Sequence, residues 1–364
     1  MPGPLHGIRI IEMAGLAPGP FGCMILADLG AEVLRIERAG GGGGLVPPQG
    51  PLDRGKNTLS LDLKSESGKK TLLALCDAAD VFVEGYRPGV AERLGIGPAD
   101  LHARNPRLIY GRITGWGQDG PLAPRAGHDI NYAAVSGALD LLGRAGEKPT
   151  PPVNLLADFA GGGMLLALGI LAALHERNTS GQGQVIDAAM VDGSALMTTF
   201  LHGMRANGLW NGPRGTNLLD TGAPCYDTYA TADGKHMAVG ALEPQFHAEL
   251  IARLGIDDED LPFHLDPTGW PQWRETLAKA FLQRTQDEWT EIFADSDACV
   301  SPVVDAWEAQ HHPHNAARGT YVEIGGVTQP APAPRFSRTS LDTPEAPSDD
   351  LPEGYLASWG ITGD

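Results

Sequence analysis

Short apolar runs alternate with helical stretches over the first half of the chain. Runs at residues 8–13, 32–36, 58–63, 80–84, 107–114 and 184–190 have the length and composition of buried strands. Helical patterns cover residues 21–29, 67–79 and 158–177. Strands that alternate with helices predict an α/β fold with a doubly wound parallel sheet, and such a sheet binds ligands at the carboxyl ends of its strands.

The pattern changes after about residue 205. Residues 228–239 predict a hairpin, because Asp233-Gly234 supplies a tight turn between two strand-like runs. Helices are expected over 244–254 and 270–294, and a proline-rich acidic segment, 328–352, is expected to lead back to the first domain. We therefore predict a large Rossmann-like domain (1–200, completed by 325–364), a small inserted α+β domain (225–320), and linkers at 201–224 and 321–335.

Charge is distributed unevenly along the 364 residues. The formal net charge is −18, yet residues 1–127 hold 14 Lys and Arg against 13 Asp and Glu, so all of the acidic excess lies beyond them. An acidic surface disfavours nucleic acid and anionic membranes as partners, since both are polyanions. A ligand that carries phosphate is therefore expected to use the N-terminal third.

Metal, disulfide and membrane signals are weak. The four cysteines are far apart and form no C-x-x-C pair, which favours a reducing, cytoplasmic setting. His311, His312 and His314 flank a proline and lack a second cluster, so a solvated turn is expected there and no metal site. The N-terminus has no basic and apolar leader, and the longest apolar run, residues 164–174, is about half of the ~20 residues that a membrane span needs.

The first turn of the predicted sheet is rich in glycine. Gly15, Gly19 and Gly22 follow the first strand, and Glu37 directly follows the second, where a dinucleotide-binding protein carries its acidic residue. The spacing is G-x-x-x-G-x-x-G, however, and not the G-x-G-x-x-G of that motif, so NAD is not expected. The run Gly40–Gly44 predicts a flexible surface loop.

Three residues are candidates for acid–base chemistry. His128 lies in a loop, where it is either a structural or surface histidine or an acid–base group, since an imidazole with an ordinary pKa of ~6.5 both takes and gives a proton near neutrality. Asp158 begins an apolar helix, where it is either an N-cap or a functional carboxylate, and the glycines at 161–163 let a ligand or another backbone come close. Glu243 precedes Pro244 and is either a helix N-terminal acid or a carboxylate aimed across a cleft.

Basic side chains of the charge-balanced third are candidates for binding phosphate, because Arg and Lys make charge-assisted hydrogen bonds to its oxygens. The alternative is a solvated basic face. The candidates are Arg38, Arg54, Lys56, Lys64, Arg87 and Arg93.

Six segments together resemble one family. They are residues 5–12 (LHGIRIIE), 27–37 (ADLGAEVLRIE), 84–90 (EGYRPGV), 127–129 (GHD), 154–158 (NLLAD) and 181–187 (GQGQVID). This pattern, spread over nearly the whole chain, resembles the family III CoA-transferases. The resemblance implies a Rossmann-like large domain with a smaller inserted domain, and a homodimer of two interlocked, ring-like chains.

Within this family the sequence resembles the racemase branch, because transferases usually carry an aromatic residue where His128 stands. The resemblance implies that His128 and Asp158 act on opposite sides of a substrate α-carbon and that Glu243 binds His128, within one chain or from the partner chain. The expected reaction interconverts the (2R) and (2S) forms of 2-methyl-branched acyl-CoA thioesters through an enolate, in lipid breakdown. Backbone N–H groups near Asp158 and at Gly161–Gly163 are candidates for binding the enolate oxygen.

The resemblance also implies the residues that bind CoA, which is part of the substrate, so that no separate cofactor is expected. The expected contacts are Arg38, Leu61, Asp62, Leu63, Lys64, Gly85, Tyr86, Arg87, Arg93, Gly127, His128, Asp129, Ile130, Asn131 and Tyr132.

Two other functions stay open. A CoA-transferase would use Asp158 as the nucleophile that forms an acyl anhydride, and a CoA-ester-binding protein would need no acid–base pair. His128 and Glu243 favour the racemase.

Overall fold

The chain folds into two compact units. The computed structural model describes residues 3–38, 50–257, 259–348 and 350–361, so the expected Gly40–Gly44 loop lies outside the described residues. The first unit comprises Met1–Ser136, Pro152–Met197 and Asn315–Asp364, and the second comprises Gly137–Pro151 and Thr198–His314. Each unit is described by itself below.

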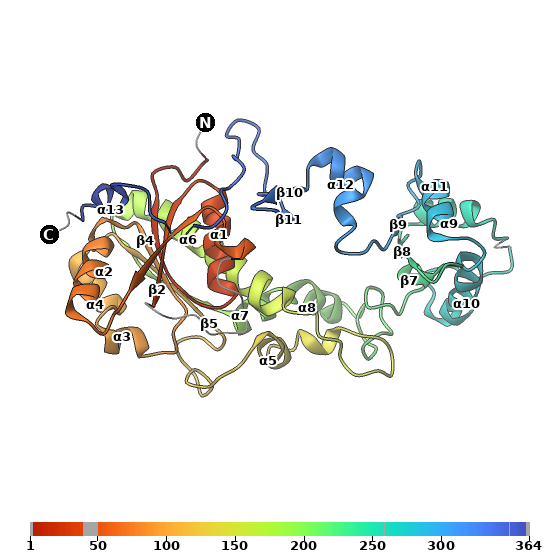
Figure 1. Cartoon of the computed structure of the whole chain (residues 1–364). Coiled ribbons are helices and arrows are strands. Elements are labelled where there is room, and N and C mark those ends of the chain that lie inside the picture. Colours follow the sequence, from red (N-terminus) through yellow and green to blue (C-terminus); the bar gives the residue numbers. More distant parts are fainter. Residues whose placement is uncertain (1–2, 39–49, 258, 349, 362–364) are drawn as a thin grey trace. The chain divides into compact units, whose positions relative to one another are not determined.

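A six-stranded parallel sheet forms the centre of the first unit (Figure 1), which confirms the predicted α/β class. The strand order is β3-β2-β1-β4-β5-β6. The direction of winding reverses between β1 and β4, which is where ligands bind in open α/β sheets. The strands are β1 (Arg9–Met13), β2 (Glu32–Arg38), β3 (Lys56–Leu61), β4 (Val81–Glu84), β5 (Ile109–Thr114) and β6 (Val185–Ala189).

Helices cover both faces of this sheet. On one face Leu72 and Leu75 of α2 pack with Leu101 of α4 and Tyr110 of β5 in a fully buried cluster. On the other face, Gly111 of β5 lies against Leu166 of α6. The helices of this unit are α1 (Pro18–Asp28), α2 (Glu66–Ala78), α3 (Val90–Leu94), α4 (Pro98–Arg104), α5 (Asp129–Val135), η3 (Leu155–Met164), α6 (Leu165–Ser180), α7 (Met190–Leu196) and α13 (Tyr355–Ser358).

The continuous helix made by η3 and α6 has the length and apolar composition of a membrane span, over Leu155–Ser180. A core helix has the same character, and this one packs against β5, β6, α1 and α7. Its first part, η3, is wound as a π-helix, a rare form that is frequent at functional sites. This part carries Asp158.

A three-stranded antiparallel sheet and several helices form the second unit. The strands are β7 (Tyr226–Ala230), β8 (His236–Gly240) and β9 (Val300–Pro302), and the helices are α8 (Thr199–Ala206), α9 (Pro244–Leu254), α10 (Trp270–Phe281) and α11 (Gln286–Phe293). The predicted hairpin and helix 244–254 are confirmed. The single helix predicted over 270–294 is wrong, because Thr285 caps a new helix by accepting a hydrogen bond from the backbone N–H of Glu288.

The boundaries of the units differ from those predicted. Residues 137–151, expected in the large domain, and 201–224, expected as a linker, belong to the second unit. An ion pair of Arg214 with Asp140 (2.8 Å) joins these two segments, and a second one, of Arg144 with Asp227 (2.8 Å), joins residues 137–151 to β7. Sequence periodicity carries no sign of such long-range pairing.

The C-terminal segment returns to the first unit, as predicted for 328–352. A hairpin of β10 (Tyr321–Ile324) and β11 (Val327–Pro330) follows α12 (Pro313–Arg318). The buried Arg54 donates hydrogen bonds to the Gln329 side chain (2.9 Å) and to the Pro330 carbonyl oxygen (2.6 Å). Arg54 also forms a 2.5 Å ion pair with Asp28, so its guanidinium has four protein contacts.

Candidate active site

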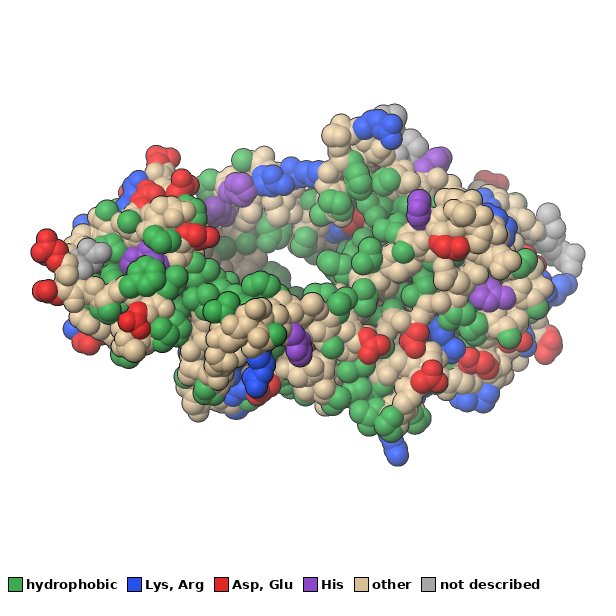
Figure 2. Space-filling view, turned by 180° about the vertical axis from the view of Figure 1, so that it is seen from behind, with side chains coloured by type: hydrophobic (Ala, Val, Ile, Leu, Met, Phe, Trp, Pro, Cys, Tyr) green, Lys and Arg blue, Asp and Glu red, His purple; other side chains and the backbone are tan. Residues whose placement is uncertain are grey.

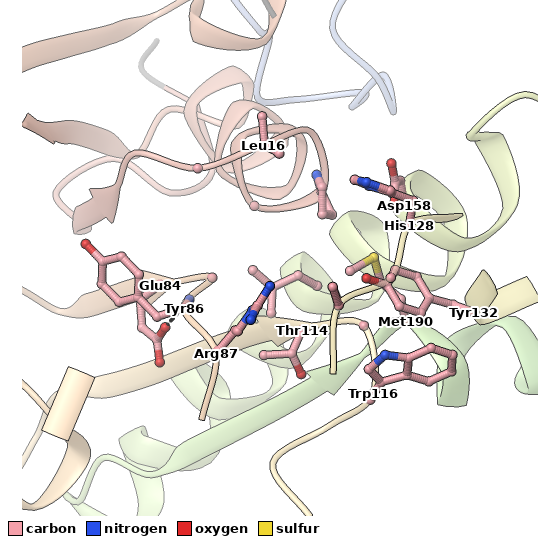
Figure 3. A pocket seen from close by; sticks show the side chains of 18 of the residues that line it. Leu16, Glu84, Tyr86, Arg87, Thr114, Trp116, His128, Tyr132, Asp158 and Met190 are labelled. Carbon is pink, nitrogen blue, oxygen red and sulfur yellow. Dashed lines mark hydrogen bonds between the residues drawn. The ribbon is translucent and has the colours of Figure 1, made fainter. Parts of the chain in front are cut away.

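A cavity of about 520 Å³ opens at the carboxyl ends of β1, β4 and β5, next to the point where the winding of the sheet reverses. Its walls include Met13, Glu84 and Thr114, each the last residue of its strand, and Met190 at the start of α7. Figure 3 shows side chains of these elements around the cavity. The site therefore lies where the strand order predicts it.

His128 and Asp158 line this same cavity, although they are 30 positions apart in the chain. His128 is the residue just before α5 and is exposed, whereas Asp158 lies in η3 and is half-buried (Figure 3). The imidazole is close enough for its charge to affect the pKa of the Asp158 carboxyl. The fold thus brings an imidazole and a carboxylate to one reaction volume.

The environment of Asp158 raises the pKa of its carboxyl. Burial raises the pKa of the carboxyl, and the nearby negative charge of Asp129 raises it further. The side-chain amide of Asn154, 3.3 Å from Asp158 Oδ2, and the charge of His128 act in the opposite direction. The net pKa lies above the ordinary value of an aspartate, which is the direction that helps a proton donor.

The backbone N–H groups expected to bind an enolate near Asp158 are already occupied. Those of Ala157 and Asp158 both donate to Asp129 Oδ2, at 2.7 and 2.8 Å. The prediction that they bind substrate oxygen is therefore wrong for this structure. A cap supplied by a side chain 28 residues away has no local sequence signal.

The glycines at 161–163 serve the packing of helices. All three are buried, and a Cβ atom on Gly161 would lie 2.7 Å from the backbone nitrogen of Ser194 in α7. On α1, a Cβ atom on Gly22 would lie 2.7 Å from the carbonyl oxygen of Gly163. Of the two alternatives that the sequence left open, close approach of another backbone is the one observed. The contact with Gly163 also explains why residue 22, in the glycine-rich segment after the first strand, is a glycine.

A second cavity, of about 290 Å³, adjoins the first one at the ends of β2 and β3. Met13, Ala14 and Tyr86 line both cavities, so Tyr86 stands between them. Residues expected to bind CoA divide between the two. The second cavity is lined by Arg38, Leu61, Asp62, Leu63, Lys64 and Tyr86, and the first by Gly85, Tyr86, Arg87, Gly127, His128 and Tyr132.

Four of the expected contacts lie outside both cavities: Arg93, Asp129, Ile130 and Asn131. Arg93 is exposed on α3, and Asn131 accepts a hydrogen bond from the backbone N–H of His128 (3.1 Å) through its side chain. Asp129 is buried beneath η3. Their assignment to CoA stays a prediction.

Two of the basic candidates are held inside the fold. Lys56 is fully buried and pairs with Glu12 at 2.7 Å, and Arg54 pairs with Asp28. Neither lines either cavity. For Arg54 and Lys56 the phosphate-binding interpretation is therefore wrong, because the charge of each is already neutralised by a buried carboxylate.

Glu243 lies in the second unit, at the residue before α9. Its backbone carbonyl accepts the N–H of His247 (3.0 Å), but its exposed side chain makes no capping hydrogen bond. Glu243 is thus the acidic residue at the N-terminus of α9, as one of its two interpretations has it, although its carboxylate caps no backbone N–H. Its pairing with His128, which lies in the first unit, stays a prediction.

The sequence analysis assigned no site role to several residues of the first cavity, among them Glu84, Trp116 and Arg125. Glu84 is fully buried, and burial raises the pKa of its carboxyl. It accepts hydrogen bonds from the Tyr86 backbone N–H (2.6 Å) and from Arg112 (2.9 Å), which fixes the turn that carries Tyr86 and Arg87. Glu84 could have been found from the sequence, because it is a carboxylate at the end of an apolar strand.

Over the described residues, no group of three or more His, Cys, Asp and Glu side chains is arranged to hold a metal ion.

Known proteins resemble this chain over most of its length. The chain is 51% identical to mouse alpha-methylacyl-CoA racemase over 92% of its length and 87% of that protein, and 49% identical to the human racemase over 94% and 88%. The crystal structure of a CAIB/BAIF family protein from Brucella suis superposes with a TM-score of 0.85, at 26% identity and 99% coverage of both chains. The model of the family described as CoA-transferase family III matches residues 5–354. The chain belongs to CoA-transferase family III.

Proposed function

We propose that this protein is an α-methylacyl-CoA racemase, which interconverts the (2R) and (2S) forms of 2-methyl-branched acyl-CoA thioesters. The observation that carries the proposal is the presence of His128 and Asp158 in the wall of one cavity. The similarity to the mouse and human racemases supports it. Such a reaction serves the breakdown of branched acyl chains.

The chemistry needs two proton-transfer groups. One group removes the hydrogen from the α-carbon, the electron pair of the C–H bond moves into an enolate, and the other group delivers a proton to the opposite face. His128 and Asp158 exchange these roles in the reverse direction. The raised pKa of Asp158 supports this scheme, because a carboxyl that donates a proton must first hold one.

The two adjoining cavities suit a CoA thioester that lies across the carboxyl ends of the strands. Arg38 and Lys64 in the second cavity offer charge to the phosphates of the nucleotide end. The pantetheine arm would pass Tyr86, which lines both cavities, and bring the thioester to His128 and Asp158.

Replacing Arg38 by alanine is expected to weaken the binding of acyl-CoA by about 10- to 100-fold, the effect of losing one hydrogen bond to a charged group. Binding of the corresponding acyl-pantetheine, which lacks the nucleotide, should not change. Isothermal titration of both ligands tests this, with Lys279→Ala as the control, since Lys279 is an exposed residue of the second unit. An equal loss for both ligands would contradict the proposed orientation of CoA.

We also propose that the protein works as a homodimer. Large apolar side chains of η3, α6 and α7 stay exposed in the single chain, with Leu155, Leu168 and Leu196 at 60%, 61% and 54%. Figure 2 shows hydrophobic side chains gathered in patches on the face in view. Large apolar side chains exposed on helices that contact one another favour an interface, and the family resemblance implies a second copy as the partner and Glu243 as a residue that reaches His128.

Replacing Leu168 by lysine is therefore expected to convert a dimer into 38.4 kDa monomers, because the charge would be desolvated at the interface. Sedimentation equilibrium measures the mass directly. Exposed Arg318→Ala serves as a control for a general effect of surface substitution. A wild-type monomer at micromolar concentration would refute the proposal.

A CoA-transferase is the second candidate, since the family includes such enzymes and Asp158 is a carboxylate of the cavity. Incubation of each enantiomer of a 2-methylacyl-CoA in deuterated water, followed by NMR of the α-position and chiral analysis, separates the two. Deuterium incorporation with interconversion is expected. No incorporation, with transfer of CoA to an added carboxylic acid, would favour the transferase and make Asp158 its nucleophile.

A further inference from the structure

The carboxylate of Asp129 joins two elements of the candidate site. Asp129 is the first residue of α5 and is 4% exposed. Its Oδ2 accepts the backbone N–H groups of Ala157 (2.7 Å) and Asp158 (2.8 Å) in η3. Its Oδ1 is buried without a hydrogen-bond partner among the described residues. A single oxygen atom therefore anchors the start of η3 to α5.

This anchor replaces a local cap. The first N–H groups of a helix lack acceptors within the helix, and a carboxylate satisfies them well. Asn154, the residue before η3, makes no capping hydrogen bond of its own. Its side-chain amide instead lies 3.3 Å from Asp158 Oδ2. The backbone of Asp158 is thus held from another element, through the residue that directly follows His128.

We propose that Asp129 is a positioning residue of proton transfer: its carboxylate fixes Asp158 relative to His128, and its negative charge helps Asp158 to hold a proton. The inference rests on the proposed racemase function. It adds a role for a residue that the family resemblance assigned to the binding of CoA, and it explains why a carboxylate is buried where it touches neither cavity.

The charges around Asp158 support the second half of the proposal. Burial raises the pKa of Asp158 most, the Asn154 amide lowers it, Asp129 raises it and His128 lowers it. Tyr132 of α5 also faces Asp158, but burial and the charge of Asp158 raise the pKa of its hydroxyl to about 12, so it stays neutral. The elements α1 and α7, which pack on η3, carry Asp28 and Asp192; Asp28 is paired with Arg54 and Asp192 is exposed. Asp129 is thus the carboxylate that raises the pKa of Asp158.

Asp129→Asn separates charge from position. The amide oxygen of asparagine can still accept both N–H groups, but the negative charge is gone. A racemase with two bases must hold one proton on the pair, and its activity falls at acidic pH when the pair takes up a second proton. Without the charge of Asp129 that second protonation becomes harder, so the acidic limb of the kcat/KM profile is expected to move to lower pH.

Asp129→Glu does the reverse, because it keeps the charge and moves the oxygen. The acidic limb should stay in place while kcat falls by about 100-fold, the cost of misplacing a catalytic group by about 1 Å. KM for the acyl-CoA should change little in both variants. Asp192→Asn, which removes one exposed charge on α7, is the matched control and should leave the profile unchanged.

The assay is deuterium incorporation at the α-carbon, followed over pH for wild type and variants, with thermal unfolding as a check on folding. If Asp129→Asn does not fold, the Asp129→Glu variant still decides the positioning half, since an unchanged kcat would overturn it. If the wild type exchanges normally and the acidic limb of the kcat/KM profile does not move in Asp129→Asn, the proposed effect of the Asp129 charge is wrong. Wild-type protein without any exchange would overturn the proposed function itself.

Discussion

Replacing His128 by alanine is expected to abolish interconversion of the two enantiomers while one of them still exchanges its α-proton. The remaining group, Asp158, can remove and return a proton on its own face of the α-carbon, but nothing delivers a proton to the other face. Loss of a positioned general acid–base group costs about 10²- to 10⁴-fold in rate. Deuterium incorporation measured by NMR, separately for each enantiomer, reads this out.

Asp158→Asn should give the mirror result, with exchange retained for the opposite enantiomer only. The asparagine is nearly isosteric, so the packing of η3 on α1 and α7 is kept. Both variants should bind acyl-CoA with nearly wild-type affinity, because the residues proposed to contact the nucleotide are untouched. Loss of exchange from both enantiomers in either variant, with binding intact, would refute the assignment of one group to each face.

The strands of the large domain could be predicted because each is a short apolar run with its own boundaries. All six appear, and their ends differ from the prediction by a few residues. The helix α5 was missed because residues 129–135 show no long apolar period, and its start is fixed by the Asn131 side chain, which accepts the N–H of His128. Boundaries set by capping depend on a few hydrogen bonds that periodicity does not carry.

The candidate site was predictable where one residue does the chemistry and was not where distant residues cooperate. His128 and Asp158 could be named from their residue types and from the family resemblance, and both line the cavity. The hydrogen bonds from the Ala157 and Asp158 N–H groups to Asp129 could not be predicted, since they join segments 28 or more residues apart. The glycines at 161–163 signal close approach, but only the structure shows that α1 and α7 are what approaches.

The buried ion pair of Lys56 and Glu12 also joins distant segments and has no local signal in the sequence. Its loss is expected to have the largest effect on stability. Their charged atoms lie 2.7 Å apart, with side chains 0% and 1% exposed. The Lys56 ammonium also donates to the Pro20 carbonyl oxygen at the start of α1, 3.0 Å away. This pair therefore links β3, β1 and the helix that packs against η3.

Lys56→Met is expected to lower the free energy of unfolding by about 3–5 kcal/mol, because it leaves the Glu12 carboxylate buried without a counter-charge. The midpoint of urea unfolding, followed by circular dichroism, measures this. The double variant Lys56→Met with Glu12→Leu should recover most of the loss, since apolar side chains of similar volume often replace a buried ion pair without cost. If Lys56→Met instead leaves stability unchanged and weakens the binding of acyl-CoA, Lys56 binds the ligand, and the structural role inferred from its burial is wrong.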